Sequence, residues 1–168
     1  LAFVLLLAGS LLLRSLWLQQ RTDTGFVADN VLTLHLSSRG TAADYGEIQR
    51  QVRQLPGVRA AGLIQLLPLQ NWGWNGFLTL APSPAGPAAQ CLAVELRYVT
   101  PGYFQALEIP IRRGRSFSDA DTSEADRVIL INESLARQLF QNVDPVGQLT
   151  DRGRIVGVVG DVRQAGLD

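Results

Sequence analysis

Two residues of this chain are of types that could act as a base or as a nucleophile. His35 is the only histidine and would have to be the base of a hydrolase triad, but no serine or cysteine motif lies near it. Cys91 is the only cysteine and begins an apolar stretch, which is typical of a packed thiol rather than of a nucleophile. A lone cysteine also excludes an intrachain disulfide and a cysteine metal site. Neither residue predicts nucleophilic catalysis.

Two clusters of charged residues could bind ions. The acidic cluster consists of Asp119, Asp121, Glu124 and Asp126. It lacks the glycine-centred loop and the terminal glutamate of an EF-hand, which favours a solvated connector over a metal site. The basic cluster consists of Arg112, Arg113 and Arg115 around Gly114. These arginines could hold an anion, but their alternation along the edge of a strand is the simpler explanation.

The run Gly157-Val158-Val159-Gly160-Asp161 is rich in glycine, as nucleotide-binding loops are. It lacks the GxGxxG spacing and the P-loop lysine, and strand-like residues follow it instead of a helix. Nucleotide binding is therefore not predicted. No catalytic residue, cofactor site or metal site remains, so we expect a transmitting or binding module and not an enzyme.

The best candidates for a contact surface are Trp72 and Trp74, in a stretch that also contains asparagine and glycine. Exposed aromatic residues anchor protein interfaces. The same two side chains could equally fill the protein's own core. Both alternatives stay open, and the pair is carried forward as candidate partner-contact residues.

The composition limits the classes of function. The 168 residues suffice for one domain of ordinary size or for two small ones. The 15 basic residues balance the 15 acidic ones, and no basic run is interleaved with aromatic residues, which argues against binding to nucleic acid. The chain contains no methionine and begins with Leu1, so we expect it to be a segment of a longer protein.

The stretch from Leu1 to Leu13 carries no charge and is rich in leucine. As a helix it would cover roughly 20 Å of a hydrocarbon layer that is roughly 30 Å thick. We interpret it as the exit half of a transmembrane helix whose earlier part precedes Leu1. Arg14 can snorkel and Trp17 is of the interfacial type, which places the lipid interface at these two residues. A signal-peptide core and a buried helix of a soluble protein are the alternatives.

In the first half of the chain a strand, a helix and a strand are predicted in succession. Val31–Ser38 alternates apolar and polar residues with the period of a half-buried strand and puts His35 on its wetter face. Tyr45–Leu55 has helical spacing and ends at Pro56-Gly57. Val58–Leu67 predicts the second strand. Together they predict a βαβ crossover with parallel strands and a helix over one face of the sheet.

The second half predicts another unit of the same kind. Val128–Ile131 is a short β-branched run, and Asn132 is of the type that caps a helix, here one expected over Glu133–Asn142. Ile155–Val159 has too few polar positions for a solvated strand and is expected to be buried on both faces. Between the two units lie the predicted strands Phe77–Leu80 and Cys91–Val99 and a helical turn at Pro101–Leu107. The fold class is therefore α+β.

Several short phrases of the sequence occur together in one order. They are Gly25-Phe26, Asn30-Val31-Leu32, Leu55-Pro56-Gly57-Val58, Leu67-Pro68-Leu69, Val99-Thr100-Pro101-Gly102-Tyr103-Phe104, Leu107-Glu108-Ile109-Pro110, Arg113-Gly114-Arg115-Ser116-Phe117, Ile131-Asn132-Glu133, Asp144-Pro145-Val146-Gly147 and Val156-Gly157-Val158-Val159-Gly160-Asp161-Val162. In this order and spacing they resemble the extracytoplasmic core domain of MacB-like ABC transporter permeases, of the FtsX-type permease superfamily. Gln148, where relatives often have a basic residue, and the short link Leu149–Arg154 depart from the pattern and imply a trimmed hairpin in the same fold.

The resemblance implies a division of the chain. Residues 1–18 would be the end of a transmembrane helix, 19–29 a connector, 30–69 the first βαβ unit of a porter-like subdomain, and 70–168 an inserted α+β subdomain. The second half of the porter and three further transmembrane helices would lie beyond Asp168. Residues from 19 onward would be extracytoplasmic, at a bacterial inner membrane, which overrides the weak positive-inside signal of Arg14 and Arg21.

The resemblance also implies how such a chain works. An ABC ATPase on a separate chain or domain would move the membrane helices, and the permease would pass this movement to a head that has no active site and no cofactor. A permease dimer and a periplasmic adaptor would be further partners, besides membrane lipid. Two other classes remain as alternatives. One is the ligand-sensing ectodomain of a membrane-anchored receptor, with a pocket lined by Trp72 and Trp74, and the other is a fragment of a soluble hydrolase.

Overall fold

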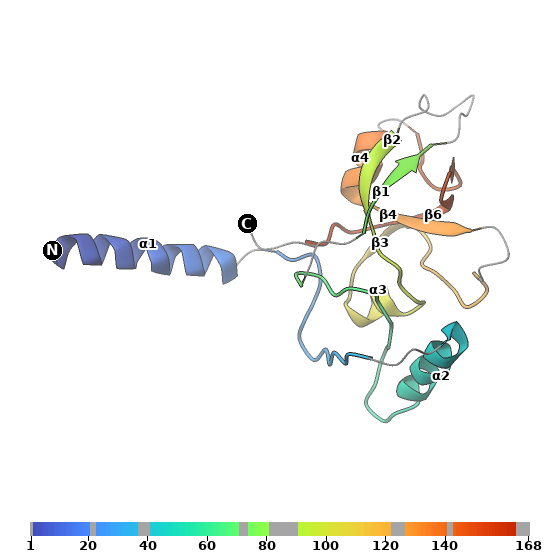
Figure 1. Cartoon of the computed structure of the whole chain (residues 1–168), viewed down its shortest axis with the longest axis horizontal. Helices are drawn as coiled ribbons and strands as arrows, with labels where there is room; N and C mark the ends of the chain where they lie inside the picture. The colour runs from blue at the N-terminus through green and yellow to red at the C-terminus, as the bar shows by residue number, and fades with distance from the viewer. Residues whose placement is uncertain are drawn as a thin grey trace.

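The computed structural model consists of a helix that projects from a mixed α/β head (Figure 1). It describes residues 2–20, 23–36, 41–70, 74–80, 91–121, 127–140 and 143–163. Helix α1 (Ala2–Gln20) stands away from the head, and its apolar side chains are exposed, Phe3 by 72% and Leu6 by 73%. In the part of the chain that is described, no helix combines the length and the hydropathy that a bilayer crossing requires.

The centre of the head is a small sheet around strand β6 (Gly153–Val159). Strand β4 (Val128–Asn132) lies parallel to β6 on one side, and β3 (Ile111–Gly114) lies antiparallel to it on the other. The two-residue strand β5 (Leu149–Thr150) forms a short hairpin with the start of β6. The predicted second strand-helix-strand unit and the buried central strand are therefore confirmed, and the trimmed hairpin stays a prediction.

Helix α4 (Glu133–Leu139) connects the two parallel strands. Its start was predicted correctly because the Asn132 side chain accepts a hydrogen bond from the Leu135 N–H, which satisfies one of the unpaired donors of the first turn. Its end was placed too late. The helix stops at Leu139, before the predicted Asn142, and the buried Phe140 caps it with a non-helical backbone.

A hairpin of β1 (Trp74–Thr79) and β2 (Cys91–Leu96) covers α4 and the sheet. Both strands were predicted, but β1 begins three residues earlier than expected, since Trp74 already pairs with Leu96. The hairpin and the sheet share one core, whose fully covered members are Leu78, Leu80, Ile131, Leu139, Phe140, Ile155 and Val158. The predicted packed thiol is wrong: Cys91 begins β2 at its outer end and is exposed.

A second core lies where residues 103–109 pack against the sheet. Its centre consists of Tyr103, Leu107, Ile109 and Val159. The short helix α3 (Tyr103–Ala106), which the sequence predicted as a helical turn, supplies the first of these. Phe26 and Val31, from the segment after α1, and Val162, from the segment after β6, pack against it. Both segments are thus built into the head.

The helix of the first predicted unit is confirmed as α2 (Ala42–Arg53). Thr41 and Asp44 form a capping box at its start: the Thr41 side chain accepts from the Asp44 N–H, and the Asp44 carboxylate accepts from the Thr41 N–H at 2.6 Å. The predicted amphipathic pattern is only partly realised. Ile48 and Val52 are half-buried, whereas Leu55 is 57% exposed.

The two strands predicted on either side of this helix are wrong. The described residues 31–36 are extended but form no strand, and Leu32 and Leu34 are 83% and 71% exposed. Residues 58–67 contribute one isolated antiparallel bridge, between Ile64 and Val99. Alternation fixes which way side chains point, but a strand also needs a neighbouring backbone to bond to, and here the two segments do not pair with each other.

Helix α2 is held to the head by one buried polar side chain. Gln49, 8% exposed, donates from its amide to the Ala61 carbonyl at 2.7 Å and to the Pro101 carbonyl at 2.6 Å. Arg53 donates to the same two carbonyls from the exposed end of the helix. The clamp joins α2 to the turn that precedes α3.

Gln49→Ala should lower the free energy of unfolding by about 1–2 kcal/mol, because two buried carbonyls lose a donor that Arg53 replaces only in part. Urea unfolding followed by circular dichroism measures this. Gln51→Ala, on the exposed face of the same helix, is the control and should change stability by less than about 0.5 kcal/mol. Equal values for the two variants would contradict the clamp.

Candidate functional site at the connector junction

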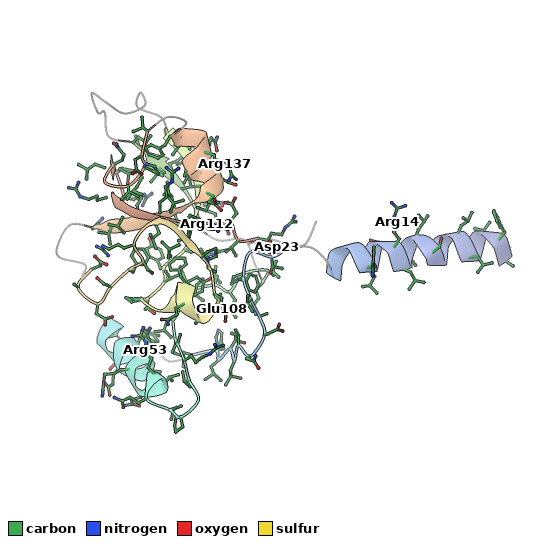
Figure 2. All side chains as sticks on the ribbon, turned by 180° about the vertical axis from the view of Figure 1, so that it is seen from behind. Arg14, Asp23, Arg53, Glu108, Arg112 and Arg137 are labelled. Atoms are coloured by element: carbon green, nitrogen blue, oxygen red, sulfur yellow. The ribbon has the colours of Figure 1, made fainter. Side chains whose placement is uncertain are left out.

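The structure leaves the predicted tryptophan contact surface untested. Trp72 lies outside the described residues, and for Trp74 only the backbone in β1 is described. The proposed interface residues both lie on α1: Arg14 points away from the helix into open space (Figure 2), and Trp17 is 53% exposed. These assignments therefore stay predictions.

The other groups considered for chemistry do not converge. His35 is exposed on the extended segment after the connector, and Cys91 is exposed on the hairpin. Within the described ranges no three histidine, cysteine, aspartate or glutamate side chains are grouped so that they could hold a metal ion. In the acidic connector, the Asp121 carboxylate receives both guanidinium nitrogens of Arg115 at 2.7 Å and the Ser118 N–H at 2.7 Å. Asp121 thus orders a turn.

An open groove lies between β3 and α4 in the described part of the head. Arg112, Arg113 and Arg137 line its rim, and Phe140 and Val158 lie at its floor. Arg112 contacts Glu133 across it at 3.3 Å. Arg112 and Arg113 thus lie on the edge strand β3 and line the groove, whereas Arg115 follows the strand and pairs with Asp121 instead.

The segment that leaves α1 enters the head through a tight turn. Asp23, at the side of the head from which α1 projects (Figure 2), accepts the Gly25 N–H on its carboxylate at 2.9 Å. Gly25 has a φ of +78°, in the left-handed region that glycine adopts without strain. A Cβ atom at Gly25 would overlap the Asp161 carbonyl oxygen and lie 3.0 Å from the Val162 Cα. The connector backbone thus touches the backbone after β6 directly.

Hydrogen bonds fix this contact on both sides of Gly25. The Arg163 N–H donates to the Thr24 carbonyl at 3.0 Å, and the Val27 N–H donates to the Leu107 carbonyl at 2.9 Å. Phe26 packs on the second core beside Val162. We call residues 23–27 together with 161–163 the connector junction.

The Asp161 side chain extends the junction to helix α4. Its Oδ1 accepts from the Asn132 side-chain amide at 2.7 Å and from the Ser134 N–H at 2.9 Å. Its Oδ2 accepts from the Ser134 hydroxyl at 2.7 Å and from the Arg137 guanidinium at 3.0 Å. Ser134 also accepts from Arg137 at 2.9 Å, which closes a small network. Four donors therefore meet one carboxylate at the first turn of the helix.

These donors set the charge state of Asp161. Partial burial acts to raise the pKa of the carboxyl, but hydrogen bonds from Ser134 and the charge and hydrogen bond of Arg137 outweigh it, so the pKa is lowered. Asp161 is ionised at neutral pH. Because its pKa is lower folded than unfolded, the stabilisation it provides is present above about pH 4 and is lost as the pH falls through the folded value.

Sequence reasoning missed the connector junction. It considered Asp161 as the end of a glycine-rich run, and it otherwise used Asp161 and Gly25 only as members of short phrases that carry the family resemblance. The two residues are far apart in the chain, and no local pattern joins them. The one signal was the glycine itself, because glycine is the residue type that tolerates a left-handed φ and a close backbone approach.

The fold and the junction define an α+β head that is anchored through its first segment to a helical stem. A model of the family described as the MacB-like periplasmic core domain matches residues 3–168. The chain therefore belongs to the MacB-like periplasmic core domain family, whose members are periplasmic domains of ABC transporter permeases, and the resemblance stated from the sequence is confirmed. No curated protein matches the chain.

Solved structures resemble the chain at low sequence identity. The periplasmic region of MacB from Actinobacillus actinomycetemcomitans superposes with a TM-score of 0.50 at 17% identity, over 71% of this chain and 51% of that one. The extracellular domain of the ABC-type transporter YknZ from Gram-positive bacteria gives 0.44 at 18% identity, over 81% of this chain and 65% of that one. The chain thus spans 51% and 65% of the lengths of these two domains.

Proposed function

We propose that this chain is the extracytoplasmic module of an ABC-type permease and that it couples ATP-driven movement of membrane helices to export or to other extracytoplasmic work. In this proposal α1 is the end of a transmembrane helix, with Arg14 and Trp17 at the lipid interface. The head has no catalytic role and no cofactor. It acts by changing position.

The observation that carries the proposal is the way in which the connector enters the head. A passive tether would hang in solvent, whereas residues 24–27 are hydrogen-bonded at both ends and packed on a core. A short segment with these contacts transmits displacement because it cannot stretch or rotate freely. Tilting α1 would therefore move the parts of the head to which the connector is bonded.

The division of the chain is part of the same proposal. Residues 1–18 would belong to the membrane helix, 19–29 to the connector, 30–69 to the first half of a porter-like subdomain, and 70–168 to an inserted subdomain. The exposed Leu32 and Leu34 support an incomplete porter half, since a row of apolar side chains on an extended segment is normally covered. The second half, lying beyond Asp168, would supply that cover.

The partners follow from the family and are proposed on that basis. An ABC ATPase would supply the movement, through the membrane helices of the permease. A second permease copy would form a dimer, and a periplasmic adaptor would receive the movement of the head. The location would be a bacterial inner membrane, with residues from 19 onward outside the cytoplasm.

Replacing Thr22-Asp23-Thr24 by three glycines tests the proposal. The change removes the Asp23 carboxylate that fixes the turn and adds backbone freedom at each position. In membrane vesicles that contain the permease and its ATPase, we expect transport to be largely lost while ATP hydrolysis continues uncoupled. The measurement compares substrate transport with the hydrolysis rate.

A matched control makes the same kind of change elsewhere. Asp119→Gly with Ala120→Gly alters an exposed turn outside the connector junction and should leave both rates unchanged. Unchanged transport together with unchanged ATPase coupling in the connector variant would contradict the proposed function.

A further inference from the structure

Asp161 lies where two segments distant in the sequence meet. Its main chain belongs to the connector junction, because the carbonyl packs against Gly25 and the chain two residues on bonds to Thr24. Its side chain belongs to the first turn of α4, through Asn132, Ser134 and Arg137. Among the contacts described above, Asp161 is thus the residue that joins the connector to the first turn of α4.

We propose that Asp161 ties the connector to helix α4, so that a displacement of the connector is passed to the α4 side of the head. This deepens the proposed function, because it names the route. The tie itself is a structural property that can be tested without any transport assay.

A carboxylate at position 161 suits this role better than a neutral amide side chain would. All four of its partners are donors, and an ionised carboxylate offers only acceptor sites. An asparagine would turn its amide group towards one of these donors and lose at least one bond. Hydrogen bonds to a charged acceptor are also roughly twice as strong as neutral ones.

The α4 side is a surface on which a displacement would have an effect. Helix α4 forms one wall of the groove whose rim carries Arg112, Arg113 and Arg137. Figure 2 shows Arg112 and Arg137 on the same side of the head as Asp23, above it in that view. Movement of α4 relative to β3 would change the spacing of these guanidinium groups.

Coupling of this kind has to be reciprocal, and this gives a two-way test. Hydrogen exchange measured by mass spectrometry reports local opening of the backbone. The sample is the full-length protein purified in detergent. In Asp161→Ala we expect connector amides, including Val27 N–H, to exchange about five- to thirty-fold faster, although Val27 does not touch the Asp161 carboxylate. In Gly25→Ala we expect the α4 amides, including Phe140 N–H, to exchange faster in turn.

Two further variants keep the test decisive. Asp119→Ala removes an exposed carboxylate outside the connector junction and should leave both peptides, 24–31 and 133–140, as protected as in the unaltered chain. Ser134→Ala removes two of the network's bonds but leaves the Asp161 carboxylate in place, and it should give an intermediate acceleration in the connector.

The outcomes distinguish the structural tie at Asp161 from its role in transport. If Asp161→Ala speeds exchange in α4 but leaves the connector as protected as before, the two segments are independent and the inference is overturned. If both segments respond, the tie stands. Transport by the same variant then tests the proposed function alone, since a broken tie with full transport would count against coupling through the head and not against the tie.

Discussion

Gly25→Ala is expected to lower the free energy of unfolding by about 2–4 kcal/mol, a large effect for the addition of one methyl group. Two costs add. The left-handed φ of +78° penalises any residue with a Cβ, and the new methyl group would overlap the Asp161 carbonyl oxygen, a backbone atom that cannot rotate away. At about 2–4 °C per kcal/mol, the melting temperature should fall by about 5–15 °C. Circular dichroism of the purified chain in detergent measures it.

Gly46→Ala is the matched control for this prediction. Gly46 lies inside α2, its φ is not positive, and a Cβ there would have no neighbour within 4 Å. Because alanine is the better helix former, this variant should be more stable by about 0.5–1 kcal/mol. The same substitution thus has opposite signs at the two positions. A Gly25→Ala chain as stable as the unaltered protein would show that the connector does not lie against Asp161.

The parts of the fold that were predicted correctly are those that local chemistry decides. Asn132 directly precedes α4 and accepts from Leu135 in its first turn, so the helix start is encoded within four consecutive residues. Ile155–Val159 is apolar on both faces because β6 contributes Ile155 and Val158 to the first core and Val159 to the second. Capping and burial determine the residue type at the position where they act, so a single segment of sequence reveals them.

The errors arose where structure depends on a distant partner. Leu32 and Leu34 alternate with polar residues as a strand would, yet they are exposed and unpaired, since no backbone in the described head lies alongside to complete a ladder. In residues 58–67, only Ile64 pairs, through a single antiparallel bridge to Val99. Alternation is a property of one segment, whereas pairing is a property of two.

The connector junction was out of reach for the same reason. Asp161 works through Gly25, Thr24 and the first turn of α4, and each contact joins segments from different parts of the chain. A glycine can be required by a turn, a crowded backbone or neither, and its type alone does not say which. Only the fold reveals that the Gly25 backbone and the Asp161 carbonyl occupy adjacent space.

Ile155→Ala should lower the free energy of unfolding by about 2–5 kcal/mol, comparable to the Gly25 variant but acting in a different part of the head. Ile155 is 0% exposed and pairs with Ile129 across the sheet. Leu78 and Leu80 of the hairpin belong to the same core, so the cavity would loosen the hairpin's grip on the sheet. Urea unfolding followed by circular dichroism measures the loss.

Two comparisons separate the cavity from other causes. Ile155→Val removes a single methyl group and should cost only about 0.5–1.5 kcal/mol. Leu149→Ala alters a strand residue that is 50% exposed and should cost less still, because most of its side chain is already in water. If Ile155→Ala cost no more than Leu149→Ala, the hairpin could not be packed on β6. The connector junction, which packs on the second core, should keep its slow hydrogen exchange in Ile155→Val, because the two cores share no buried residue and a single methyl group is too small a loss to open both.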